Sequence, residues 1–353
     1  MEEYVTALLA EMALYPEQSS NTVFDTVYIG GGTPTFLREG LLARIMDGAY
    51  RYFQIKNDAE VSMEANPGTL TRAKLEEYRE AGINRLSMGL QSTYDEHLAK
   101  LGRIHTIEDF RQGFGMAREK GFDIINIDLI SGLPGQTVSE WRQTLNSIVR
   151  IDPEHISCYG LKIEEGTPMH ADLLSGLIEL PPEEEMLEMI HSTQAILEAK
   201  GYSRYEISNY AKAGRECLHN QNYWDCGEYL GLGLGSHSCI RSKGGALERS
   251  ENQNTLTDYF KDIQIGIRPV LKSELISYDA EIFEYVMLRL RLDEGIVFER
   301  FQDRFKFHFA TQYNKNIEKL CSVGLANLDG FHFHLTPKGM DVQNQIILYL
   351  MPN

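Results

Sequence analysis

The chain has 353 residues, of which 42% are hydrophobic and 24% charged, and it carries a formal net charge of −17 at pH 7. This composition is typical of a folded protein with room for two domains, and it excludes a disordered chain. The acidity argues against nucleic acid as a partner, because a phosphate-backbone binder needs a concentrated basic face. No apolar run is long enough to span a membrane and the N-terminus is acidic rather than basic, so we expect a cytoplasmic protein.

Helices and short apolar strands alternate from the start of the chain. The spacing of apolar residues between Tyr4 and Met12 predicts an opening amphipathic helix. Strand-like segments follow at 26–30, 59–65, 84–90, 123–130 and 154–160, with helical segments near 39–53, 70–81, up to about 120, around Trp141 and at 180–201. This alternation predicts parallel βαβ units.

The remainder of the chain does not continue the strand–helix alternation. Residues 203–211 predict one more strand, and 215–240 fit no single period, so we expect an irregular functional loop there. Beyond 277, helices at 280–292 and 314–330 precede an alternating, hairpin-like segment at 331–339, which suggests a winged-helix-like domain. We therefore expect a partial barrel over 1–210, a connecting region over 211–276 and a C-terminal helical domain over 277–353.

Polar and turn-forming residues follow the predicted parallel strands. Glycines 30–32 follow the first strand, and Glu64, Gln91 and Asp128 follow later ones. Loops at the carboxyl ends of parallel strands converge and form ligand sites. Glycines permit φ > 0 and a close approach of a ligand to the backbone. Neither a GxGxxG nor a GxxxxGKS spacing occurs, which disfavours a dinucleotide fingerprint and a P-loop.

Several motifs in chain order resemble a known family. They are "YIGGGTPT", "EANPGTL", "NRLSMGLQS", "LGRIH" and "NIDLISGLPGQT". Together they resemble radical S-adenosylmethionine (radical SAM) enzymes of the oxygen-independent coproporphyrinogen III oxidase family. Within it, "YEISNYAKAG" followed by "HNQNYW" resembles the HemW branch of haem chaperones. The resemblance implies an α/β fold, a partial parallel (β/α)6-type barrel without its first strand, followed by a helical, winged-helix-like domain.

The resemblance also implies ligand contacts. Gly31, Gly32 and Thr33 match positions that contact the methionine moiety of S-adenosylmethionine. The positions that hold its amino-acid part or ribose are matched by Glu64, Gln91, Arg103 and Asp128. An arginine suits a carboxylate and an aspartate suits hydroxyl groups. Read without the family, Arg103 is a solvated cation at a helix end.

His219, in "HNQNYW", is the haem candidate. An imidazole nitrogen can ligate haem iron, and neighbouring aromatic rings can pack on the porphyrin. His237 is a weaker candidate that also fits a turn histidine satisfied by backbone groups. We expect a haem chaperone that binds haem and S-adenosylmethionine and delivers haem to acceptor proteins, membrane-associated ones among them. The alternatives are an oxygen-independent coproporphyrinogen III oxidase and a cluster-free haem-binding module.

The cysteines depart from the family pattern. The family's Cys-x3-Cys-x2-Cys motif, which binds a [4Fe-4S] cluster, does not occur in this sequence. The five cysteines, expected to be free thiols, are Cys158, Cys217, Cys226, Cys239 and Cys321. Their spacings match neither zinc nor iron-sulfur sites.

The position of the missing motif suggests where it was lost. The first barrel strand and the cluster loop would lie upstream of Met1, in about 30 residues by usual strand and loop lengths. We expect a truncated sequence rather than an evolved cluster-free form. A chain without the cluster cannot supply the electron that cleaves the sulfonium, so we assign no catalytic residue. The sequence leaves open whether haem is bound covalently and whether the chain forms a homodimer.

Overall fold

The computed structural model describes residues 1–17, 22–242 and 244–351. The chain divides into two compact units. The first comprises Met1–Val5, Glu17–Arg204 and Ser208–Glu216, and the second comprises Thr6–Pro16, Tyr205–Ile207 and Cys217–Asn353. The predicted boundaries at 210 and 276 stay a prediction. Among the described residues, no helix has the length and apolar character that crossing a membrane requires.

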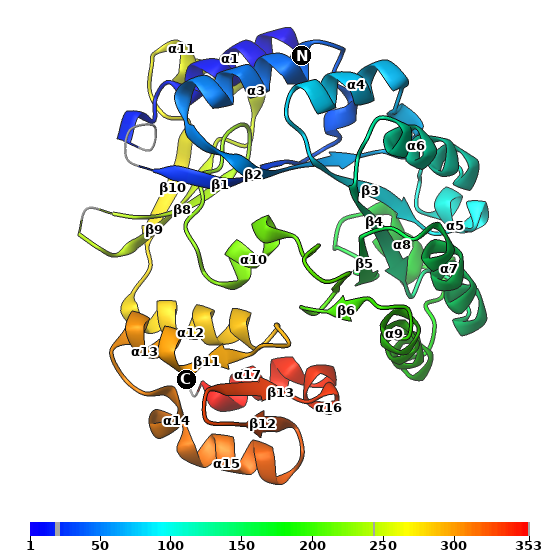
Figure 1. Ribbon diagram of the computed structural model, residues 1–353, viewed down its shortest axis with the longest axis vertical. Helices are drawn as coiled ribbons and strands as arrows, with labels where there is room; N and C mark the ends of the chain where they lie inside the picture. Colours follow the sequence, from blue (N-terminus) through cyan, green and yellow to red (C-terminus); the bar gives the residue numbers. More distant parts are fainter. Residues whose placement is uncertain (18–21, 243, 352–353) are drawn as a thin grey trace. The chain divides into compact units, whose positions relative to one another are not determined.

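The first unit is built on a seven-stranded sheet with the strand order β1-β2-β3-β4-β5-β7-β6. Strands β1 to β5 are parallel, and β7 and β6 each run antiparallel to their neighbour. The strands are β1 (Val23–Ile29), β2 (Gln54–Ala65), β3 (Arg85–Gln91), β4 (Ile124–Ser131), β5 (His155–Gly160), β6 (Ser203–Arg204) and β7 (Asn209–Ala211). Figure 1 shows the sheet curling, which confirms the predicted partial parallel barrel.

Helices cover the outer side of this curled sheet (Figure 1). They are α3 (Leu41–Tyr52), α4 (Arg72–Glu80), α5 (Asp95–Lys100), α6 (Ile107–Glu119), α7 (Val138–Ile151), α8 (Pro168–Leu174) and α9 (Glu183–Glu198), with short 3-10 turns η1 (Pro34–Phe36) and η2 (Pro67–Thr69). Threonines cap four of them: Thr106 and Thr137 form capping boxes on α6 and α7, Thr71 caps α4, and Thr167 caps α8. These caps explain why the predicted helices begin where they do.

The two faces of the parallel strands differ in chemistry. Alternate residues such as Met63, Leu86 and Ile127 are fully buried in the core that the helices share. The residues between them are polar: Glu60, Ser62, Glu64, Arg85, Ser87, Asn126, Asp128, His155 and Ser157. Because successive side chains of a strand point to opposite faces, the polar set lies on the face away from that core.

The second unit contains the end of helix α1 (Glu2–Met12), two small antiparallel sheets and most of the C-terminal helices. The first sheet has the order β10-β9-β8 and the second β11-β13-β12. The elements are α10 (Leu218–Trp224), β8 (His237–Arg241), β9 (Leu247–Asn252), α11 (Leu256–Gln264), β10 (Val270–Leu275), α12 (Tyr278–Arg289), β11 (Ile296–Val297), α13 (Phe298–Phe305), α14 (Phe309–Gln312), α15 (Asn314–Ser322), β12 (Ala326–Leu328), β13 (His332–Leu335), α16 (Pro337–Asp341) and α17 (Gln343–Leu350). Helices with a small sheet follow Ser277, as predicted.

Three predicted elements differ from the structure. The single strand at 203–211 is two short strands, because Glu206 between them pairs with Leu292 instead. The irregular loop at 215–240 contains helix α10, whose seven residues are too few to show a helical period. The helix at 314–330 ends at Ser322, since Gly324 turns the chain with φ +74° into strand β12.

Candidate ligand site at the ends of the parallel strands

Glu64, near the end of β2, holds the glycine loop that follows β1. The backbone N–H of Gly31 donates to Glu64 Oε2 at 3.2 Å, and the Tyr28 hydroxyl donates to Oε1 at 3.0 Å. A Cβ atom on Gly30 would lie 2.8 Å from Glu64 Oε1, so a side chain there would displace the Glu64 carboxylate. Gly31 and Gly32 have φ values of +85° and +64°, which favour glycine for a second, conformational reason.

Thr35 fastens the same loop to the one that follows β2. Its hydroxyl accepts hydrogen bonds from Asn66 N at 3.2 Å and from the Thr69 hydroxyl at 2.6 Å. Lys74 Nζ donates to its carbonyl oxygen at 2.7 Å. Thr35 is fully buried. The sequence analysis missed this residue, which lies within η1 and is the second threonine of Thr-Pro-Thr.

Asp128, on β4, is hydrogen-bonded by neighbouring polar side chains. The Ser87 hydroxyl donates to Oδ2 at 2.9 Å, and Asn126 Nδ2 donates to Oδ1 at 2.8 Å. Burial raises the pKa of the Asp128 carboxyl, these hydrogen bonds oppose the rise, and the charge of Glu64 adds to it. Glu64 is paired with Ser87 in the sheet and Ser87 donates to Asp128, so the two carboxylates lie on neighbouring strand ends.

Gln91 ends β3 next to the Asp128 strand. Gly89 is paired with Asp128 in the sheet, and a Cβ atom on Gly89 would lie 2.9 Å from Gln91 Nε2. Gln91 has φ 71°, an uncommon value for a residue other than glycine. Backbone strain of this kind tends to occur at functional sites. Glu64, Gln91 and Asp128 thus occupy adjacent strand ends.

Two other predicted residues are less closely tied to this group. Arg103 is exposed in the turn after α5, and within the described part of the chain its guanidinium makes no hydrogen bond or ion pair. Thr33 precedes η1, and its side chain does not cap that turn. The structure therefore does not bring Arg103 into contact with Glu64 or Asp128.

Asp128 belongs to a network of hydrogen-bonded polar side chains on the sheet. Asn126 Nδ2 also donates to the Ser87 hydroxyl at 2.7 Å, while Asn126 Oδ1 lies 2.6 Å from His155 Nδ1 and accepts from the Ser157 hydroxyl at 3.1 Å. Burial and the charge of Arg85 lower the pKa of His155 well below its usual value, so the ring is neutral. Its proton then sits on Nδ1, since the facing atom is an acceptor. Sequence reasoning missed this network.

The haem candidate His219 lies in the second unit, on α10. Its Nε2 is 3.0 Å from the Tyr223 hydroxyl, one helical turn away, and the two rings meet edge to face at 5.0 Å. Tyr223 in turn meets Tyr229 edge to face at 4.7 Å. His237 is the exposed first residue of β8. The helix thus presents a half-buried imidazole within a row of aromatic rings.

The described residues do not fit a [4Fe-4S] cluster. Residues 1–17, 22–242 and 244–351 contain no group of three or more His, Cys, Asp or Glu side chains that could hold a metal ion. All five cysteines are free thiols, as predicted. Burial raises the pKa of the Cys158, Cys226 and Cys239 thiols, to about 12 for Cys226, and so disfavours the thiolates that bind iron.

The chain is similar to known proteins over nearly its whole length. Residues 17–148 match the Radical SAM superfamily, and residues 276–342 match the HemN C-terminal domain. Heme chaperone HemW of Bacillus subtilis is 35% identical over 98% of this chain and 90% of its own length. The heme chaperone HemW of Buchnera aphidicola is 32% identical, over 98% of this chain and 89% of its own.

A solved structure agrees with these matches. Coproporphyrinogen III oxidase (HemN) from Escherichia coli, a radical SAM enzyme, superimposes with a TM-score of 0.83 at 25% identity, over 99% of this chain and 83% of that chain. The family predicted from the motifs is confirmed. The chain belongs to the HemW family of heme chaperones, within the radical SAM superfamily.

Proposed function

We propose that this protein is a haem chaperone that binds haem and S-adenosylmethionine and passes haem to acceptor proteins. The observation that carries the proposal is the 35% identity to heme chaperone HemW of Bacillus subtilis over 98% of the chain. The lower identity to the HemN oxidase, 25%, makes decarboxylation of coproporphyrinogen the second candidate. The proposal extends to a cytoplasmic location, membrane-associated acceptors and a homodimer.

The S-adenosylmethionine site that we propose lies at the ends of β1 to β4. The donor set suits the ligand, because Glu64 offers a carboxylate to an ammonium group and Asp128 offers one to ribose hydroxyls. Gly31, Gly32 and Thr33 supply backbone groups to the methionine moiety, and Gln91 supplies a carboxamide. Arg103 is assigned to the ligand carboxylate because it is an exposed guanidinium, the group that suits a carboxylate.

Radical SAM proteins use S-adenosylmethionine with a [4Fe-4S] cluster. When bound, such a cluster supplies an electron to the sulfonium. The residues described here do not provide its ligands, so we assign no catalytic residue and derive no radical step for this chain. Their contribution is to position S-adenosylmethionine.

For haem, we propose His219 as the iron ligand. The imidazole nitrogen Nε2 now contacts the Tyr223 hydroxyl, so ligation requires that this contact be exchanged for iron. The rings of Tyr223 and Tyr229 offer an aromatic surface to a porphyrin. His237 remains the second candidate, in the connecting region 211–276 that we propose as the haem-binding segment.

A haem titration of the full chain tests the chaperone proposal. We expect a Soret shift on haem addition that is lost in His219→Ala and kept in His308→Ala, a control at an exposed histidine of the second unit. In Tyr223→Phe the Soret shift persists, because the Tyr223 hydroxyl contacts His219 Nε2 but is not itself the iron ligand. An unchanged Soret band in the wild type, or an equal shift in His219→Ala, contradicts the assignment.

A further inference from the structure

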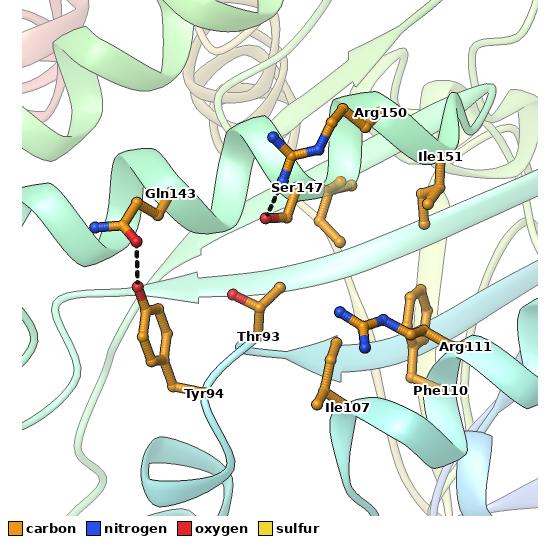
Figure 2. A pocket seen from close by; sticks show the side chains of 10 residues that line it. Thr93, Tyr94, Ile107, Phe110, Arg111, Gln143, Ser147, Arg150 and Ile151 are labelled. Atoms are coloured by element: carbon orange, nitrogen blue, oxygen red, sulfur yellow. Dashed lines mark hydrogen bonds between the residues drawn. The ribbon is translucent and has the colours of Figure 1, made fainter.

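A cavity on the helical side of the first unit uses none of the residues proposed for haem or S-adenosylmethionine. It has a volume of about 340 Å³ and lies between α6 and α7, beside the turn that follows β3 (Figure 2). A volume of this size accommodates a small organic ligand.

The walls of this cavity combine an apolar surface with two cations. Ile107 and Phe110 of α6 and Ile148 of α7 supply apolar surface, and Phe110 and Ile148 are buried. Arg111 of α6 and Arg150 of α7 bring two guanidinium groups to the same cavity from facing helices (Figure 2). The result is an amphiphilic lining in a chain whose net charge is −17.

Neither guanidinium is strongly neutralised. Arg150 Nη2 donates to the Ser147 hydroxyl at 2.9 Å, and within the described ranges it has no carboxylate partner. Arg111 does have a carboxylate partner, since its Nη1 lies 3.7 Å from Glu108 Oε2, one helical turn away. Both side chains are exposed, and an ion pair of this kind contributes little. The remaining polar groups are paired as well: Tyr94 with Gln143 at 3.1 Å, and Thr93 with Thr144 at 2.8 Å.

We propose that this cavity binds a small anion attached to an apolar, ring-bearing body. The anionic group, a carboxylate or a phosphate, pairs with Arg111 and Arg150, which offer forked donors suited to either. The apolar body rests on Ile107 and Phe110. A neutral apolar molecule leaves the cations unused, and an inorganic anion leaves the apolar wall uncovered.

The probe for this site is 8-anilinonaphthalene-1-sulfonate, an aromatic ring system with one anionic group. The chain has two tryptophans, and Trp141 lies on α7, so a Trp224→Phe background isolates Trp141 emission. We expect the probe to quench Trp141. In Arg111→Gln/Arg150→Gln the dissociation constant rises about tenfold, since charge-assisted hydrogen bonds are lost. Added salt weakens binding in the parent protein and much less in the double variant.

The control is Arg142→Gln, an exposed arginine of the same helix that does not line the cavity and pairs with Glu188. It leaves the dissociation constant unchanged. Thermal melting confirms that each variant is folded, and the single variants replace the double one if it melts early. Equal affinity in the double variant, absent Trp141 quenching, or equally tight binding of the neutral N-phenyl-1-naphthylamine would overturn the proposal.

Discussion

The Tyr259 hydroxyl donates a hydrogen bond of 2.6 Å to Glu11 Oε2, although the two residues are 248 positions apart. Asn252 Nδ2 donates to the other oxygen at 2.7 Å, and Gly233 N donates to Oε2 at 2.8 Å. Glu11 is 0% exposed. The opening helix therefore ties together the glycine-rich loop, β9 and α11 inside the second unit.

Replacing Glu11 by Ala should destabilise the second unit by about 3 kcal/mol, because three buried donors lose their common acceptor. Glu3→Ala, at an exposed position of the same helix, is the control and should change stability by less than about 0.5 kcal/mol. Urea unfolding measures both. A loss for Glu11→Ala no larger than that of the control contradicts the structural role.

The same residue predicts a pH dependence. Burial raises the pKa of Glu11 above its usual 4.5, so the folded state binds its proton more tightly than the unfolded state. The Glu11 contribution to stability is therefore fully present below pH 4.5 and declines as pH rises through the folded-state pKa. The stability difference between wild type and Glu11→Ala, measured by urea unfolding from pH 4 to 8, should shrink with rising pH. A stability difference that grows over this pH range contradicts a raised Glu11 pKa in the folded state.

Arg289 holds the chain just beyond α10. Its side chain is 1% exposed, pairs with Asp225 and Glu294, and donates from Nε to the Gly295 carbonyl at 3.0 Å. We expect Arg289→Met to cost about 3 kcal/mol, because two acids lose a buried partner, and to weaken haem binding by displacing α10. Arg300→Met is the matched control: Arg300 approaches the same two acids but is 56% exposed. Thermal melts and haem titrations of both variants distinguish the buried cation from the exposed one.

Gly30 and Gly115 provide a contrast between two glycines of the first unit. A Cβ atom on Gly30 collides with Glu64 and Tyr28, whereas one on Gly115, within α6, meets nothing within 4 Å. Gly30→Ala should raise the dissociation constant for S-adenosylmethionine about tenfold, because Glu64 must move. Gly115→Ala should bind S-adenosylmethionine as well as the wild type does. It should be more stable by about 1 kcal/mol, because alanine has the higher helix propensity. Calorimetric titration decides, and unchanged affinity in Gly30→Ala removes Glu64 from the site.

The strands and helices of the first unit were predictable because each has a local signal. The apolar runs mark β1 to β5, and residues such as Thr106 and Thr137 mark helix starts. The proposed ligand residues Glu64, Gln91 and Asp128 were singled out by the rule that strand ends converge. The residues that hydrogen-bond them could not be predicted in this way, because the contact of Ser87 with Asp128 depends on the register of β3 against β4. Glu11 was equally hidden, since its partners lie more than 200 positions away.

Ser87 offers a test of the proposed ribose contact at Asp128. Burial raises the Asp128 pKa above 3.8, and the Ser87 hydrogen bond lowers it. An ionised carboxylate accepts hydroxyl hydrogen bonds better, so S-adenosylmethionine should bind more weakly as pH falls through the Asp128 pKa. In Ser87→Ala that pKa rises further, and the midpoint of the affinity loss should move to higher pH, while Ser139→Ala on α7 leaves it in place. Affinities measured from pH 4.5 to 8 test this, and a midpoint shared by all three proteins would separate Asp128 from the ligand.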